Sequence, residues 1–68
     1  MHNAEMKAEF EAKSAEIVSI QAELARISAA LKQEQEPTAA EALRREGTAY
    51  AHRVNKLKDE LRTLMLGV

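Results

Sequence analysis

Residues 33–41 read QEQEPTAAE, and this short stretch separates two long helical patterns. Pro37 biases the residue before it away from helical backbone, so a first helix ends near this point. Thr38 then fits the N-cap of a new helix, and Glu41, three residues later, completes a capping box. A connection this short predicts two antiparallel neighbours, with a first helix at about 4–35, a turn at 36–38 and a second helix at about 39–66.

Apolar residues repeat at seven-residue intervals on both sides of this turn. A strict heptad repeat is typical of a helix that lies along another helix. The sequence therefore predicts an all-α, coiled-coil-like antiparallel hairpin held by one apolar seam. Before the turn the seam residues are Met6, Phe10, Ile17, Ile20, Leu24, Ile27 and Leu31. After it they are Ala40, Leu43, Gly47, Tyr50, Val54, Leu57, Leu61, Leu64 and Val68.

Two seam positions depart from the apolar pattern. Lys13 is expected to lay its alkyl stem on the core while its ammonium group reaches water. Gly47 costs about 1 kcal/mol relative to alanine in the middle of a helix. Its presence indicates either a close approach of the two backbones near Leu24 and Ile27 or a kink in the second helix, and we expect the close approach.

Flanking residues give two further expectations. Asn3 is a candidate N-cap for the first helix. Glu16 and Glu23 are expected near Arg53, because an antiparallel hairpin brings these positions together.

The chain is too small to build a large core. It has 68 residues and no cysteine, and His2 and His52 lie far apart in the sequence. Domains of this size are marginally stable and usually gain stability from disulfides, a metal or oligomerisation. Disulfides are excluded, and neither a metal nor a cofactor is expected. The sequence therefore predicts a homodimer, with two hairpins forming a four-helix bundle.

Some apolar residues at the C-terminus and on the first helix are candidates for the dimer interface or for a foreign partner, and of the C-terminal ones Met65 and Leu66 fall outside the seam. An exposed apolar cluster often marks such an interface. One set lies at the C-terminus: Leu64, Met65, Leu66 and Val68. The other lies on the outward face of the first helix: Ala15, Val18 and Ala22. Alanine is also the best helix former, so the second set has a purely local explanation as well.

Polar partner contacts are predicted for one region of the second helix. Tyr50 has the register of the seam, and the nearby polar residues are His52, Arg53 and Lys56. These residues form either a solvated basic face or an anchor for an acidic partner.

The composition favours a binding protein over an enzyme. A two-helix rod offers no enclosed cavity in which titratable groups converge, so no catalytic site is expected. The formal net charge of −1 favours neither nucleic acid nor an anionic membrane as the partner. No signal peptide or membrane span is expected, because charged residues interrupt every apolar run, and the predicted location is the cytoplasm. We expect a module that homodimerises and binds, masks or escorts another protein. An RNA-binding four-helix bundle is the alternative.

Overall fold

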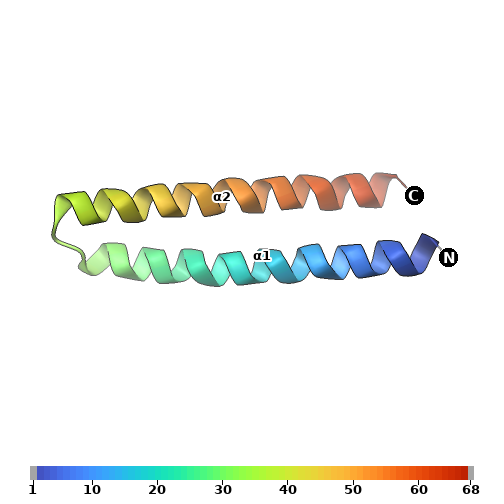
Figure 1. Cartoon of the computed structure of the whole chain (residues 1–68), viewed down its shortest axis with the longest axis horizontal. Coiled ribbons are helices and arrows are strands. Elements are labelled where there is room, and N and C mark those ends of the chain that lie inside the picture. Colours follow the sequence, from blue (N-terminus) through green and yellow to red (C-terminus); the bar gives the residue numbers. More distant parts are fainter. Residues whose placement is uncertain (1, 68) are drawn as a thin grey trace.

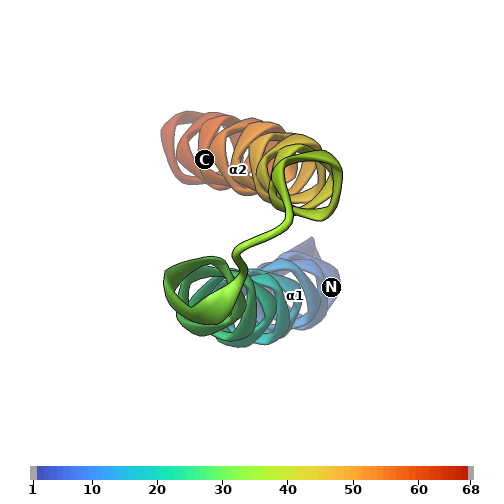
Figure 2. The same cartoon turned by 90° about the vertical axis from the view of Figure 1, so that its left-hand side faces the viewer.

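The computed structural model describes the backbone of residues 2–67 and the side chains of residues 4–67. It contains two helices, α1 (His2–Gln33) and α2 (Pro37–Leu66), joined by residues 34–36. Figure 1 shows them side by side and antiparallel, with both termini at the end opposite the turn. Seen end-on, they cross at a shallow angle (Figure 2), as in coiled-coil packing. The predicted helical hairpin is confirmed.

The seam is best covered in the middle of the hairpin. Ile17, Ile20, Val54 and Leu57 form a buried cluster, and Leu57 is only 1% exposed. Nearer the turn, Ile27 and Ala40 are also buried. Phe10 departs from its predicted core position, with 41% of its surface exposed. It lines a surface groove between the first part of α1 and the end of α2, and its side chain is therefore incompletely covered.

The start of α2 differs from the predicted capping box. Glu36, and not Thr38, is the N-cap, and its carboxylate accepts a hydrogen bond of 2.9 Å from the backbone N–H of Ala39. Pro37 occupies the first helical turn, where its missing N–H is not needed. At the other end of the chain, α1 has already begun at His2, so Asn3 lies within the helix instead of before it. The side chain of Asn3 and the whole of Val68 lie outside the described residues.

This correction makes the cap testable. Glu36→Ala is expected to lower the free energy of unfolding by about 0.5–1 kcal/mol, because the Ala39 N–H loses its acceptor. Thr38→Ala is the matched control and should change it by less than about 0.5 kcal/mol, because Thr38 is exposed. Urea unfolding followed by circular dichroism measures both. A larger loss of unfolding free energy for Thr38→Ala than for Glu36→Ala would show instead that Thr38 caps the helix.

Gly47 lies against α1, as the close-approach interpretation predicts. α2 is continuous through this position, and Figure 1 shows no sharp bend there. A Cβ atom added at Gly47 would lie 3.6 Å from Cγ2 of Ile27, an ordinary van der Waals distance. The space therefore accepts a methyl group, and the approach does not require glycine.

Gly47→Ala is accordingly expected to raise the free energy of unfolding by about 0.5–1 kcal/mol, because it restricts the unfolded chain and suits a helix. Gly67→Ala serves as the comparison, since a Cβ there would lie 3.1 Å from the carbonyl oxygen of Thr63 and should give no gain. Thermal unfolding of the two variants provides the measurement. A lower midpoint for Gly47→Ala would show that the glycine is needed for packing.

Candidate interaction surface

The two long edges of the hairpin differ in chemistry. We assign heptad positions with Phe10 at position a of α1 and Ala40 at position a of α2. Positions g and c then follow one edge, and positions e and b follow the other. We call the first edge the ion-pair side and the second the groove side.

The ion-pair side carries the contacts that link the helices through charge. Three ion pairs cross from α1 to α2 among the described residues: Lys13–Glu60 at 3.0 Å, Glu16–Arg53 at 2.7 Å and Arg26–Glu46 at 3.1 Å. The predicted pairing of Glu16 with Arg53 is confirmed. Glu23 forms its ion pair with Arg26 of its own helix at 2.9 Å, and the described residues include no ion pair between Glu23 and Arg53.

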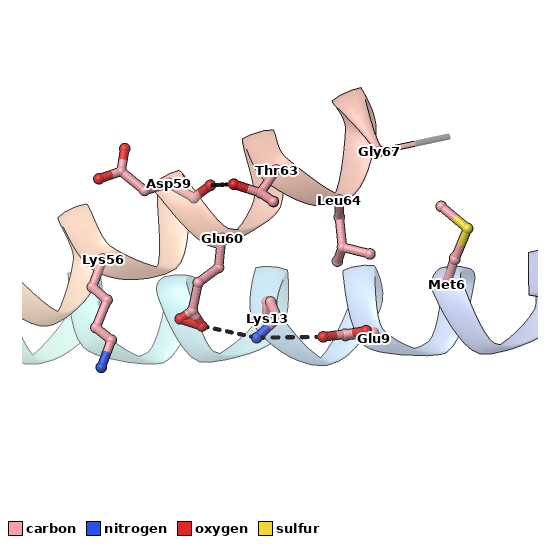
Figure 3. Close-up of a pocket in the computed structure, with 9 residues that line it drawn as sticks. All are labelled: Met6, Glu9, Lys13, Lys56, Asp59, Glu60, Thr63, Leu64 and Gly67. Carbon is pink, nitrogen blue, oxygen red and sulfur yellow. Dashed lines mark hydrogen bonds and ion pairs between the residues drawn. The ribbon is translucent and has the colours of Figure 1, made fainter.

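Lys13 has the best-enclosed charge of this edge. Figure 3 shows its ammonium group between the carboxylates of Glu60 and Glu9, which lie 3.0 and 3.7 Å from Nζ. The Lys13 side chain is 21% exposed, so its stem is largely covered as predicted, while its charge is held by two acids. The groove around them has a volume of about 570 Å³ and is also lined by Met6, Lys56, Asp59, Thr63, Leu64 and Gly67.

This contact shifts two pKa values in opposite directions. The hydrogen bond to Glu60 raises the pKa of Lys13 above its ordinary 10.5, and the two acids add to the effect. The same hydrogen bond lowers the pKa of Glu60 below its ordinary 4.5, although partial burial opposes it. The Glu60 contribution to stability is thus present above pH 4.5 and is lost as the pH falls through the lowered pKa.

The pair predicts a specific pH dependence. Lys13→Met should lower the unfolding midpoint at neutral pH, and the difference from the parent chain should shrink as the pH falls through the pKa of Glu60. The raised pKa of Lys13 has the opposite sign, so its contribution is complete below pH 10.5 and is lost only at higher pH. Thermal unfolding of both proteins between neutral and strongly acidic pH measures this. If the unfolding midpoints of the two proteins differed by the same amount at every pH, the Lys13–Glu60 pair would have no role in stability.

The groove side is built mainly from uncharged and basic residues with two acids, Glu11 and Glu41, and the described part of the chain has no ion pair between the helices along it. Its position e residues are Lys7, Ser14, Gln21 and Ser28 in α1, and Arg44, Ala51, Lys58 and Met65 in α2. Its position b residues include Glu11, Val18, Ala25 and Lys32 in α1, and Glu41, Thr48, Asn55 and Arg62 in α2. Between Glu11 and Lys32, the α1 part of this edge has no charge.

Two grooves give this edge its name. Near the turn, a groove of about 420 Å³ is lined by seam residues together with Ser28, Arg44, Gly47, Thr48 and Ala51. At the open end, a smaller one of about 170 Å³ is lined by Met6, Lys7, Phe10, Leu64 and Met65. Three of the four exposed large hydrophobic residues in the described part of the chain belong to or border this edge: Phe10, Val18 (65% exposed) and Met65 (65% exposed). Most of the exposed large hydrophobic surface of the hairpin thus lies on or beside the groove side.

The interface residues expected from the sequence fall on different surfaces. Val18 and Met65 lie on the groove side, while Leu64 is a half-buried seam residue that borders grooves on both edges. Ala15 and Ala22 are exposed on the outward face of α1, opposite the seam. Leu66 lies on the outward face of α2 and is 79% exposed.

The residues of the predicted polar contact region differ in burial and in the contacts they make within the hairpin. Tyr50 is half-buried and packs against the core cluster. Arg53 is held by Glu16 on the ion-pair side, where Lys56 lines the larger groove. His52 is exposed on the outward face of α2.

Two further findings limit the chemistry of these surfaces. Within the described residues, no three histidine or acidic side chains group closely enough to hold a metal ion. Neither helix is both long and apolar enough, over the described residues, to cross a membrane.

Sequence reasoning missed the division into two edges, although the signal was present. Acids occupy three g positions of α1, Glu9, Glu16 and Glu23, whereas its e positions hold Ser14, Gln21 and Ser28.

Comparisons of this chain with protein-family models, curated protein sequences and solved structures find no match.

Proposed function

We propose that this chain is a non-enzymatic protein-interaction module, which homodimerises into a four-helix bundle and binds another protein to mask, escort or inhibit it. The single observation that carries the proposal is an excess of exposed surface. The chain has a mass of 7.6 kDa and exposes 5293 Å². A compact monomer of the same mass is expected to expose about 4300 Å².

The excess of exposed surface is close to the area that one partner would cover. A standard interface covers about 800 Å² on each side, close to the excess of about 1000 Å². Relative to an unfolded chain of about 11000 Å², the hairpin buries about half of its surface, below the roughly 60% that domains of this size bury. Covering one such interface brings the buried fraction to about 60%.

The shape of the chain agrees with this excess. Its radius of gyration is 15.7 Å. A compact domain of this length has a radius of gyration of about 11 Å. The single hairpin is therefore more extended than a domain that covers its own core.

Charge favours a protein partner over RNA. Four of the ten basic residues, Lys13, Arg26, Arg45 and Arg53, are held by glutamates of the same chain. A nucleic-acid surface needs such groups free to meet phosphates. We expect the module to act in the cytoplasm, because a chain without cysteine forms no disulfides and so needs no oxidising compartment.

Sedimentation equilibrium of the purified chain tests the self-association. At micromolar concentrations we expect a helical species with twice the mass of one chain, which is 7.6 kDa. Circular dichroism confirms that the chain is folded under the same conditions. A folded species that keeps the mass of a single chain throughout would overturn the dimer.

The second part of the proposal concerns the outward faces that a bundle leaves free. The tagged parent chain and its Leu66→Asp variant are used to capture partners from nuclease-treated extract of the native host. We expect a stoichiometric protein with the parent chain and its loss with Leu66→Asp, while the dimer mass stays unchanged. Capture of nucleic acid alone, without nuclease, would favour the RNA-binding alternative.

A further inference from the structure

The ion pairs fix how the two helices are aligned along the rod. In Lys13–Glu60, Glu16–Arg53 and Arg26–Glu46, the two residue numbers add up to about 72, as expected for two antiparallel helices in a constant register. Each α1 residue thus lies level with the α2 residue for which the two residue numbers add up to about 72. This rule places every residue of the groove side along the rod.

We propose that the groove side is the surface on which a second copy of this chain docks, with the turns of both copies at the same end of the bundle. The proposal rests on the self-association proposed above and adds its surface and its orientation. A two-fold axis parallel to the rod places α1 of one copy against α2 of the other. Each helix of the bundle is then antiparallel to both of its neighbours.

Charge complementarity along the outer row supports this orientation. Position b residues of α1 meet position b residues of the second copy's α2 at the same level. Glu11 then meets Arg62 of the second copy, and Lys32 meets Glu41 of the second copy. Both acids of the groove side face a base, and two-fold symmetry repeats each pair. Among the described residues, Glu11 and Lys32 take part in none of the ion pairs within the hairpin, whereas Glu41 and Arg62 each have an exposed partner on α2, Arg45 at 3.0 Å and Asp59 at 4.0 Å.

Side-chain size along the inner row agrees with the same arrangement. Position e residues of α1 face position e residues of the second copy's α2. The long side chains of Arg44 and Lys58 meet Ser28 and Ser14 of the second copy, and Gln21 meets Ala51 of the second copy. Apart from Lys7, which comes level with Met65 of the second copy, each large residue thus faces a small one, as interdigitated packing requires, and no like charges are opposed.

The other two-fold arrangement lacks this complementarity. An axis perpendicular to the rod places α1 on α1, with the turns at opposite ends. Val18 then faces Val18 of the second copy, and Glu11 faces Ala25 of the second copy. Neither acid of the groove side meets a base there. The ion-pair side is the poorer surface in either arrangement, because its charges are already satisfied within one hairpin.

Cross-linking distinguishes the two orientations directly, because the chain has no cysteine of its own. Val18→Cys and Asn55→Cys, both at exposed positions, are prepared as separate full-length proteins and treated with a short bis-maleimide, alone and as an equimolar mixture. Circular dichroism first confirms that both remain helical. We expect cross-linked dimers in the mixture, joining position 18 of one copy to position 55 of the other, as identified by mass spectrometry.

The other outcomes overturn the proposal. A dimer formed by Val18→Cys alone, at a yield equal to that of the mixture, would place the turns at opposite ends. Absence of cross-links in every sample, for a chain that sediments as a dimer, would remove the groove side from the interface. A chain that sediments as a monomer would instead refute the self-association on which the proposal rests.

A charge-exchange cycle provides an independent test. Glu11→Arg and Arg62→Glu should each raise the dimer dissociation constant by roughly fivefold to tenfold at low salt, because each change places like charges together twice per dimer. The double variant should return to within about twofold of the parent, because the ion pair is restored in reverse. Additive losses in the double variant would show that the two residues do not meet across the interface.

Discussion

Leu57→Ala is expected to lower the free energy of unfolding by about 2–5 kcal/mol, enough to unfold much of a hairpin this small. Leu57 is the largest fully buried side chain among the described residues, and it lies in the central cluster with Ile17, Ile20 and Val54. Its truncation removes apolar contacts and leaves a cavity that a two-helix seam closes only in part. Urea unfolding, followed by circular dichroism, measures the loss.

Leu66→Ala is the matched control for this experiment. It makes the same chemical change nine residues later on the same helix, at a side chain that is 79% exposed. We expect a change within about 0.5 kcal/mol. Equal losses for the two variants would mean that the seam does not run where the structure places it.

Ala51→Glu is expected to weaken the dimer by roughly a hundredfold or more, because it places an unpaired carboxylate in the middle of the groove side. Ala51 is exposed in the single hairpin and lines the groove near Gly47, so the substitution should leave the helices intact. In the proposed bundle it faces Gln21 of the second copy, and symmetry buries two such carboxylates. Sedimentation equilibrium gives the dissociation constant.

The comparison for Ala51→Glu is Ala49→Glu. This variant makes the same change two residues earlier, at an exposed position on the edge of α2 that faces the ion-pair side. The dissociation constant should stay within about threefold of the parent value, since that edge lies outside the proposed interface. An equal loss in both variants would point to a general effect of charge and would contradict the assignment of the groove side.

The arrangement of the helices was predictable because it follows from periodicity and one turn. The heptad positions of Ile17, Ile20 and Leu57 give their angle about the helix axis, and angle determines burial in the middle of a two-helix seam. The pairing of Glu16 with Arg53 followed from the same register. The exposure of Phe10 did not, because periodicity gives a direction and contains no information on how well the end of a seam is covered.

The start of α2 was harder to predict, for a reason of local chemistry. Thr38 and Glu41 match a capping box, and glutamate is not among the preferred N-cap residues. Pro37 was the better signal, since proline favours the first helical position and so places the cap one residue before it. The division into two edges required the alignment of α1 with α2, which the ion pairs of the folded hairpin supply.

We propose that this hairpin completes its fold by pairing with a second copy. The most direct test is thermal unfolding at chain concentrations from about 1 μM to about 1 mM, because association that stabilises only the folded state makes the midpoint depend on concentration. We expect the midpoint to rise steadily with concentration for the parent chain and to be nearly constant for Ala51→Glu. A parent midpoint that does not change across this range would contradict it.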